Sequence, residues 1–438
     1  METISIIGII AALVLLFILI MKGVNIFVAA AAATVVIALT GQINVYMAFT
    51  DSYMSGFVGF IKSNFLVFVA GALLGKVYEI TNGAKSIARL IVKGLGPKYA
   101  VFAIPLAVGL MTYGGIAGYV LCFAVFPIAL EVFRASDIPR RFIPAAIVMG
   151  CCTFSSWGPG TPQLPNVALS KALSIPLTAG FTCGIITVVL QAVFSLLMLK
   201  LVVSKAQSNG EHFIAKQTDV FKDDAVMPGG ALALIPLALT LLCINIKVNG
   251  TALVPTEFGI AGGAALAYIL MRTYHADGQP LMQHVGTAIS NAISSAAVTS
   301  AMVAIGSVAK AAVGFPTAIN GLTSIAPGVP LVSVAIGGIL AGGICGSATG
   351  GTGIVAPLFA PIFAAKGLAM EVMGRVIVTG AHFGGTLPNN GFINTVTSGI
   401  AKETYKDSYG PVFLVVTVGN LFATVVAVIL FTILPNLP

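Results

Sequence analysis

Long apolar segments separated by short polar ones make up most of the chain. The apolar segments fall at about 3–21, 23–40, 57–78, 100–133, 141–174 and 177–204, and then at about 229–247, 255–271, 285–312, 330–365, 372–402 and 409–435. A helix that crosses a bilayer needs roughly 20 apolar residues. The pattern therefore predicts an all-α polytopic membrane protein.

One long hydrophilic stretch divides the chain nearly in half. It runs over residues 205–228 and contains Glu211, Lys216 and Asp219. We expect a linker here, with residues 1–204 as the first structural repeat and residues 229–438 as the second. The predicted scaffold helices are 1–78 and 229–312, and helices 177–204 and 409–435 close the two halves.

Two segments in each half are too long for one simple span and are interrupted by Gly, Pro, Ser and Thr. In the first half these are a hairpin over 100–133, interrupted at 111–118, and a broken helix over 141–174, interrupted at 153–166. In the second half a hairpin over 330–365 is interrupted at 345–353, and a broken helix over 372–402 is interrupted at 382–391. Paired interruptions in corresponding positions are typical of transporters built from inverted repeats.

Short sequence matches accompany this common order. Gly114-Gly115 matches Gly350-Gly351, and Leu164-Pro165-Asn166 matches Leu387-Pro388-Asn389. Each match alone is weak. Together with the order of the parts they indicate an old duplication.

The charges indicate how the chain crosses the membrane. If both hairpins are re-entrant, each half crosses five times, and the odd number inverts the second half. With the loop after Tyr78 in the cytoplasm, only six basic residues fall outside: Lys62, Lys171, Lys247, Lys310, Lys366 and Arg375. The other sixteen of the 22 Lys and Arg residues fall inside, as the positive-inside rule expects. If each hairpin instead crossed the membrane fully with both helices, the number of crossings per half would still be odd. The polar interruptions of the hairpins favour re-entry, because irregular backbone is not tolerated against lipid. We expect an inner-membrane protein with a cytoplasmic linker and both termini on the outer side.

Composition excludes several classes of protein. Hydrophobic residues make up 58% of the chain and charged residues 8%, against about 45–50% and 25% in soluble proteins. A soluble enzyme, a nucleic-acid-binding module and a disordered scaffold are excluded.

The net charge of +8 lies mainly between apolar segments, so it indicates topology and no nucleic-acid partner. The six cysteines lie in apolar stretches without metal-ligand spacing, and enzyme motifs such as HExxH and GxSxG are absent. We expect no cofactor, no metal and no catalytic residue.

The four interruptions are the candidate substrate site. Half-helix N-termini carry free N–H donors and partial positive charge, which suit an anion. None of the four contains Lys or Arg, so an anion would be held by backbone dipoles and uncharged side chains. Such tracts also serve close helix packing, but four in corresponding positions favour a binding site. The predicted substrate-binding residues are Thr112, Tyr113, Gly114, Gly115, Ser155, Ser156, Gly160, Thr161, Gln163, Asn166, Gly346, Ser347, Thr349, Gly350, Gly351, Thr352, Thr386, Asn389 and Asn390.

His382 is the one histidine inside an apolar segment. An imidazole titrates near neutral pH and can carry a coupling proton. The alternative is a packing histidine with its hydrogen bonds satisfied.

At these interruptions the sequence resembles the gluconate permease (GntP) family of proton symporters, within the larger ion-transporter superfamily. The resemblance is carried by residues 110–115, 123–127, 135–144, 160–163 with Asn166, 346–351, 386–388 and 390–391, and is closest to the subgroup for small hydroxy-carboxylates. It implies an elevator-type transporter in which a scaffold forms a homodimer and a mobile part carries substrate. In that subgroup an acidic residue precedes the Thr-Leu-Pro and a histidine follows it. Here those positions are Gly385 and Asn389, with His382 upstream, so the coupling role does not transfer directly.

Three hypotheses follow. The first is a proton-coupled symporter of a small organic anion, gluconate-like or a hydroxy-monocarboxylate. The second is a sodium-coupled carboxylate symporter, in which carbonyl and side-chain oxygens at the interruptions bind the ion. The third, of a different class, is a membrane receptor that kept the fold and does not transport. The roughly 23-residue linker is too short for a signalling domain, which disfavours a receptor.

Overall fold

A computed structural model describes the chain except residues 97–98, 114–117, 162, 220–225, 246, 249–250, 253, 276–278, 322–328 and 435–438. The described residues form helices joined by turns and loops, together with two short paired strands, β1 (Lys247–Val248) and β2 (Thr251–Ala252).

The helices of the first half follow the apolar segments closely. They are α1 (Glu2–Met21), α2 (Ile26–Thr40), α3 (Val45–Met47), the π-helical turn η1 (Ala48–Tyr53), α4 (Met54–Ile80), α5 (Gly83–Leu95), α6 (Ala100–Tyr113), α7 (Gly118–Ala135), the 3₁₀ turn η3 (Arg140–Phe142), α8 (Ile143–Cys152), α9 (Phe154–Trp157), α10 (Leu164–Leu173) and α11 (Phe181–Ser208). Some differ from expectation, and α3 and η1 lie before the predicted segment 57–78. α5 is a helix where the basic residues indicated a loop, and α11 continues past residue 204 into the hydrophilic stretch.

The second half has a similar order of elements. Its helices are α12 (Gly230–Asn245), α13 (Thr256–Met271), the 3₁₀ turn η4 (Arg272–Tyr274), α14 (Leu281–Ala311), α15 (Gly314–Gly321), α16 (Pro330–Cys345), α17 (Ala348–Ala364), α18 (Met370–Gly385), α19 (Gly391–Asn394), the π-helical turn η6 (Thr395–Ile400), α20 (Tyr405–Val412), the π-helical turn η7 (Phe413–Thr417) and α21 (Val418–Ile433).

Five helical stretches among the described residues are long and apolar enough to cross a membrane. They are Glu2–Ile20, Val45–Ile80, Phe181–Ser208, Leu281–Ala311 and Tyr405–Ile433. Shorter apolar helices accompany them, among them α2, α6, α16 and α17. An isolated short helix cannot satisfy its terminal backbone groups in lipid, so these short helices depend on protein neighbours.

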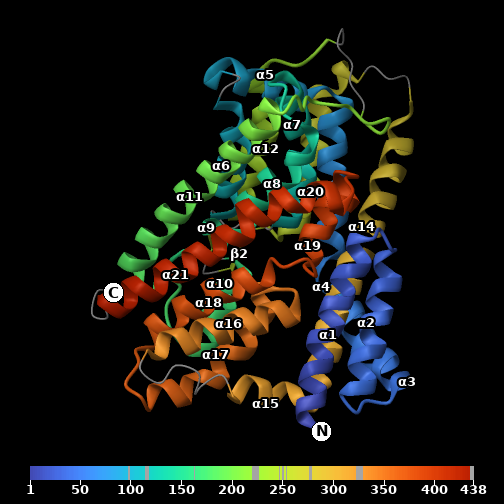
Figure 1. The fold of residues 1–438 in the computed structure, drawn as a ribbon. Helices are drawn as coiled ribbons and strands as arrows, with labels where there is room; N and C mark the ends of the chain where they lie inside the picture. The colour runs from blue at the N-terminus through green and yellow to red at the C-terminus, as the bar shows by residue number, and fades with distance from the viewer. Residues whose placement is uncertain are drawn as a thin grey trace.

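The helices form two packed groups that meet along α4 and α14 (Figure 1). In one group α1 packs on α2, and α14 packs on both α2 and α4. In the other, α16 packs on α17 and α18, and α18 packs on α21, which also contacts α11. α4 contacts α7, and α14 contacts α16 and α19, so the hairpin and broken-helix segments lie against the first group.

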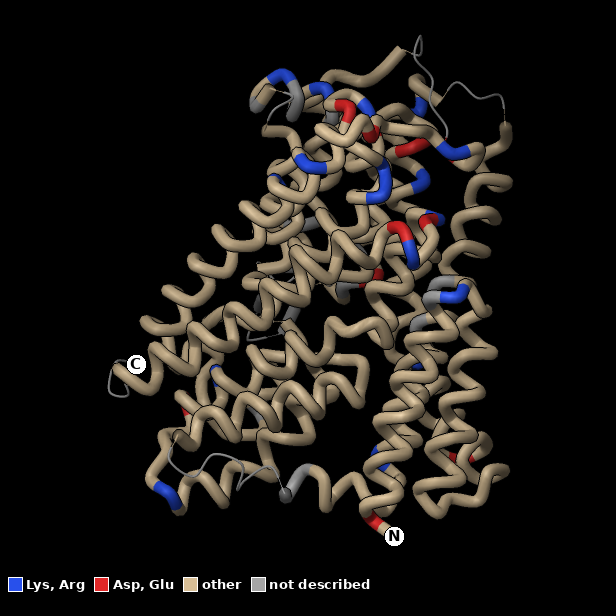
Figure 2. The backbone as a smooth tube through the Cα atoms, in the orientation of Figure 1, with Lys and Arg blue, Asp and Glu red and all other residues tan. Residues whose placement is uncertain are grey.

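Charged residues gather at one end of the molecule, around α5, α7 and the hydrophilic stretch, while the N-terminus lies at the opposite end (Figure 2). Much of the side-chain surface between the ends is apolar. Exposed Ile, Leu, Val and Phe side chains line α1 and α11, as expected of faces that contact lipid.

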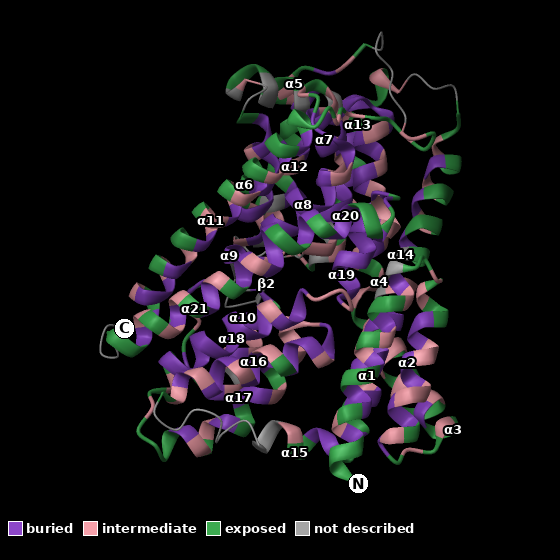
Figure 3. Cartoon of the chain, in the orientation of Figure 1, coloured by how far each residue is buried: buried purple, intermediate pink, exposed green. Residues whose placement is uncertain are grey.

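The first helices of the two broken segments, α8 and α18, are almost entirely buried (Figure 3). Residues 143–151 of α8 are all buried, and so is almost all of α18. Glycine makes this enclosure possible where α16 crosses α18. A Cβ at Gly342 would lie 2.3 Å from the carbonyl oxygen of Ala381, and one at Gly384 would lie 1.9 Å from that of Ile339. Small residues at a crossing let two helix backbones approach closely.

Candidate functional site

The first interruption of a broken helix follows α8. This helix ends at Thr153, where the backbone leaves the helical conformation (φ −119°, ψ −136°). The single turn α9 follows, and Gly160 then adopts a left-handed conformation (φ +85°) that a side chain would disfavour. The hydroxyl of Ser155 donates to the carbonyl of Gly150 at 2.5 Å, which satisfies one of the acceptors freed by the break.

Asn166 holds this interruption in shape. Its amide nitrogen donates to the carbonyls of Thr161 at 2.8 Å and Leu177 at 3.2 Å. Gln163 reaches the tip of the first hairpin, where it donates to the carbonyl of Thr112 at 2.7 Å. Tyr113, at the same tip, donates to the carbonyl of Pro159 in the first broken helix at 2.5 Å. The first hairpin and the first broken helix therefore form one hydrogen-bonded unit.

The second interruption depends on Asn390. Its amide nitrogen donates to the carbonyls of Gly385 and Gly346, the latter at 3.2 Å. Its amide oxygen caps α19 by accepting from the backbone N–H of Ile393 at 2.8 Å, a role typical of Asn at a helix start. Asn389 donates to the carbonyl of Gly343 at 2.6 Å. Both asparagines thus join the second broken helix to the tip of the second hairpin.

The tip of the second hairpin is a sharp turn between α16 and α17. Gly346 takes a left-handed conformation there (φ +57°). Ser347 caps α17, because its hydroxyl accepts from the N–H of Gly350 at 3.3 Å. Thr349 and Gly350 are half-buried, while Gly351 is buried where a Cβ would lie 2.4 Å from the backbone nitrogen of Gly342. The tip presents the N-terminus of a 17-residue helix.

Two predicted site hydroxyls are buried without a hydrogen-bond partner. They belong to Thr161 in the first interruption and Thr352 in α17. Just after the second interruption, in α19 and η6, Asn394 Oδ1 and Thr397 Oγ1 are also buried and unpaired. An unpaired buried polar group costs free energy, so each of these atoms is a candidate contact for a ligand.

The interruptions of the two halves contact each other. α10 packs against α17 of the second hairpin, and α7 of the first hairpin contacts η6. The rings of Tyr119 and Phe392 meet edge to face with centroids 5.0 Å apart. The hairpins and broken helices of the two halves are therefore in contact with each other. Gly114 and Gly115 of the predicted site lie outside the described residues.

A chain of side-chain amides crosses the centre between the halves. Trp157 Nε1 donates to Gln191 Oε1 at 2.9 Å, and Gln191 Nε2 donates to Asn420 Oδ1 at 2.6 Å. Asn420 in turn donates to the carbonyl of Cys152 at 3.0 Å and reaches Thr386 Oγ1 at 3.4 Å. Sequence reasoning missed Gln191 and Asn420. The signal for each was a side-chain amide within an apolar stretch of helix, which membranes tolerate only where it is paired or functional.

His382 lies in the last turns of α18 and is only 2% exposed. Its Nδ1 lies 2.7 Å from the carbonyl of Val378, so that nitrogen carries the proton. Nε2 then carries the lone pair, and no described residue forms a hydrogen bond with it. The carbonyl of His382 accepts from Thr386 Oγ1 at 2.9 Å, which places the ring beside the second interruption.

Arg375 is the important residue whose burial the sequence analysis did not predict. It was counted only as a basic residue on the outer side, and the structure shows it 1% exposed within α18. Its Nη1 donates to the carbonyl of Trp157 at 2.7 Å and to Asn166 Oδ1 at 2.8 Å. Nε and Nη2 donate to the carbonyls of Ala179 and Leu177 at 2.6 and 2.5 Å. The interruptions themselves contain no basic residue, but a buried guanidinium from the other half reaches the first one.

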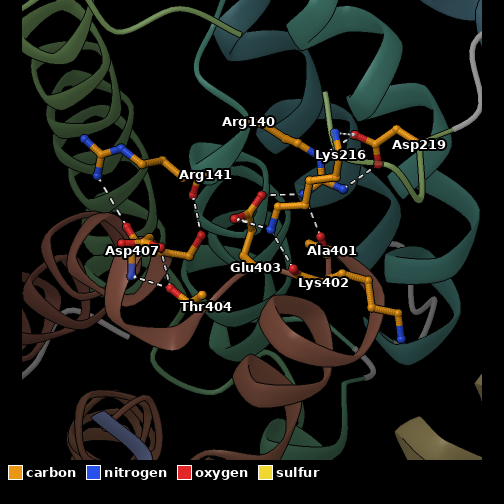
Figure 4. Close-up of polar contacts among 10 residues, drawn as sticks. Arg140, Arg141, Lys216, Asp219, Ala401, Lys402, Glu403, Thr404 and Asp407 are labelled. Carbon is orange, nitrogen blue, oxygen red and sulfur yellow. Dashed lines mark hydrogen bonds and ion pairs between the residues drawn. The ribbon is translucent and has the colours of Figure 1, made fainter. Parts of the chain in front are cut away.

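A cluster of ion pairs lies at the charged end, where both broken helices meet the hydrophilic stretch (Figure 4). Arg140, at the start of the first broken helix, pairs with Asp219 from that stretch and with Glu403, which follows the second broken helix. Lys216 pairs with Glu403 at 2.7 Å. Arg141 pairs with Glu211 at 2.7 Å nearby. The hydrophilic stretch is thus attached to the ends of both broken helices.

A cavity of about 380 Å³ opens between α1 and the second interruption. Its walls include Ile10, Val14, Leu340 and Leu387, and Asn389 is its one polar side chain. This lining suits apolar material and offers little to an anion. Among the described residues no group of three His, Cys, Asp or Glu side chains is placed to bind a metal ion.

Comparisons with known proteins find relatives that are named as transporters. No protein-family model matches it. The chain is 29% identical over 433 residues to the uncharacterized transporter YxjC of Bacillus subtilis, covering 90% of this chain and 91% of the relative. It is 26% identical over 195 residues to an uncharacterized transporter of Haemophilus influenzae, covering 44% of each. The crystal structure of the YdaH transporter of Alcanivorax borkumensis aligns with 90% of this chain and 89% of its own at 18% identity and a TM-score of 0.42, a likeness too low to carry an argument.

The relatives and the apolar helices support a multi-pass membrane protein with a transport function. They indicate neither the substrate nor the coupling ion, and they support a transporter family without singling out gluconate permeases. A transport role also favours a protein that is not an enzyme.

Proposed function

We propose that the protein is a proton-coupled symporter of small organic anions, of the gluconate or hydroxy-monocarboxylate class. The observation that carries the proposal is the meeting of two interrupted helices and two hairpins, joined through Gln191 and Asn420 and bordered by the buried Arg375. Free helix ends, unpaired hydroxyls and a nearby cation are what an anion needs in a site that excludes water.

The mechanism we propose is of the elevator type, on two inverted repeats. Residues 1–78 and 229–312 form the scaffold and, in a homodimer, the contact between subunits. The hairpins and broken helices form the mobile part. Their contacts across α4–α7, α14–α16 and α14–α19 then form the sliding surface. The charged end faces the cytoplasm of an inner membrane, and the termini face the outer side. This arrangement agrees with the gathering of charge at one end.

His382 is the proposed proton carrier. The lone pair of Nε2 has no partner among the described residues, and the ring adjoins the second interruption through the hydrogen bond between Thr386 and the carbonyl of His382. A proton taken up there adds positive charge beside the anion, so the two bind cooperatively. The coupling follows from that mutual stabilisation.

Uptake into proteoliposomes tests the proposal. Purified protein is reconstituted, and uptake of radiolabelled D-gluconate, D-lactate and 3-hydroxybutyrate is followed with the interior alkaline. We expect accumulation of at least one acid that collapses when a protonophore dissipates the gradient. Asn166→Ala and Asn389→Ala should reduce uptake, and His382→Ala should abolish accumulation while leaving exchange of labelled for unlabelled acid. Full uptake in all three variants would show that the site lies elsewhere.

Sodium coupling is the second candidate, because the interruptions expose carbonyl and hydroxyl oxygens, which also bind sodium. Sodium coupling would be shown by uptake that depends on sodium when the pH is the same on both sides of the membrane. Such uptake should be unaffected by the protonophore. Binding of an acid without exchange across a sealed membrane would instead indicate a receptor.

A further inference from the structure

The cation buried beside the first interruption has no anionic partner. Arg375 is 1% exposed, and its four hydrogen bonds all go to neutral oxygens, three of the backbone and one of Asn166. Glu371, one helical turn earlier on α18, is exposed and forms no ion pair with it. Buried charges in proteins are normally paired with an opposite charge, so a full positive charge stands uncompensated here.

The guanidinium also has a donor to spare. Arginine carries five N–H groups, and the hydrogen bonds of Arg375 use one on Nε, two on Nη1 and one on Nη2. The second N–H of Nη2 has no acceptor among the described residues. A buried charge and an unused donor on the same group are what a carboxylate would satisfy.

The position of Arg375 connects this charge to the candidate site. Its Nη1 donates to the carbonyl of Trp157 and to Oδ1 of Asn166, both in the first interruption. Tyr113, at the tip of the first hairpin, donates to the carbonyl of Pro159 in the same interruption. Arg375 therefore places a positive charge where the first hairpin meets the first broken helix.

We propose that Arg375 is the counter-charge of the transported anion and that it selects a carboxylate over an uncharged analogue of the same shape. The inference rests on the proposed function and names the residue that recognises the charge of its substrate. A carboxylate bound here pairs with the buried guanidinium, and a buried charge costs less free energy when it is paired. A neutral analogue leaves the cation uncompensated.

Equilibrium binding to the purified full-length protein tests the proposal. The probes are D-gluconate, D-lactate and 3-hydroxybutyrate, each beside its uncharged amide, and the quantity measured is the ratio of acid affinity to amide affinity. In the wild type we expect the acid to bind at least about tenfold more tightly, the size of a charge-assisted hydrogen bond. Arg375→Lys keeps the charge and should keep most of that ratio, while Arg375→Gln should bring it close to one.

A second variant removes the net charge without removing the arginine. Asn166→Asp places a carboxylate 2.8 Å from Nη1 and should also bring the ratio close to one. Lys366→Gln is the matched control, because it removes an exposed positive charge shortly before α18 and should leave the ratio unchanged. A loss of folding alone would lower both affinities together and would not change their ratio, so the ratio separates charge from structure.

The outcomes separate the two proposals. Wild-type protein that binds none of the three acids overturns the proposed function, and this inference with it. Acid binding in the wild type with an unchanged ratio in Asn166→Asp, or in a folded Arg375→Gln, overturns the inference and leaves the proposed function standing.

Discussion

The guanidinium of Arg140 and the carboxylate of Asp219 form a buried ion pair with two parallel contacts. Nε lies 2.7 Å from Oδ2 and Nη2 lies 2.6 Å from Oδ1, and both side chains are less than 5% exposed. Arg140 begins the first broken helix, whereas Asp219 belongs to the hydrophilic stretch between the halves. The pair therefore attaches that stretch to a part of the protein that we propose to be mobile.

Asp219→Asn should destabilise the protein strongly. Removing one partner of a buried ion pair costs about 3–5 kcal/mol, because the other charge is left in a low-dielectric environment. Glu403 is a second partner of Arg140 and reduces the loss toward the lower figure. The apparent Tm in detergent, followed by thermal unfolding of the purified protein, should fall clearly.

Glu211→Gln is the matched control for that variant. The pair of Arg141 with Glu211 has similar geometry, but its side chains are 32% and 38% exposed. Partly exposed pairs contribute about 0–1 kcal/mol. Equal losses of Tm in the two variants would show that burial does not set the strength of the Arg140 pair.

Gly384→Ala should disrupt the crossing of α16 and α18. A Cβ at this position would lie 1.9 Å from the carbonyl oxygen of Ile339, so one helix must shift. Overpacking of this kind costs about 1–3 kcal/mol, and the same thermal unfolding assay measures it. At Gly353 in α17 a Cβ would meet nothing within 4 Å. Gly353→Ala should therefore be neutral or slightly stabilising, and a loss as large as that of Gly384→Ala would contradict the packing argument.

Gln191→Met should change the fluorescence of Trp157. The chain contains one tryptophan, so the emission reports on the first interruption alone. Removing the hydrogen bond from Nε1 to Gln191 leaves a buried donor unpaired, which costs about 1–3 kcal/mol. We expect a shorter emission wavelength and a lower Tm. Gln207→Met removes an exposed glutamine that donates to the carbonyl of Asp137 and should leave the emission unchanged.

At low pH, residues 211–215 at the start of the hydrophilic stretch should lose their hydrogen bonds to Asp137. Hydrogen bonds from His212 and from the N–H of Phe213 hold the pKa of Asp137 below its ordinary value. Because the folded pKa lies below the unfolded one, the contribution is complete at neutral pH and is lost as the pH falls through the folded pKa. Hydrogen exchange at residues 211–215, corrected for the intrinsic rate, should stay constant between pH 7 and pH 5 and rise below about pH 4.

Asp137→Asn serves as the control for this titration. Asparagine tolerates the left-handed backbone conformation of residue 137 (φ +51°) but does not ionise near pH 4. The variant should show the same exchange at all these pH values. Acid-induced exchange in the variant would assign the titration to another group.

Individual residues show which parts of the candidate site could be predicted from the sequence. Asn389 and Asn390 stand in a Gly- and Pro-rich tract, so the local pattern is enough to suggest an interruption and a capping role. Arg375 gave no such signal. Its partners at residues 157 and 166 lie far away in the chain, and one basic residue near the predicted end of a segment is indistinguishable from a loop charge. α5 was missed because the expected spans were found by apolar length, and that helix carries basic residues among its apolar ones.

The sequence by itself determined the helical membrane class, the division of the chain at the hydrophilic stretch and the places where helices are interrupted. These follow from the local density of apolar, small and polar residues, which acts within one segment. Only the tertiary structure decided that Arg375 lies at the first interruption, that Gln191 meets Asn420, and that Arg140 pairs with Asp219. A buried charge or amide must find partners wherever the packed chain brings them, and that pairing depends on the fold as a whole.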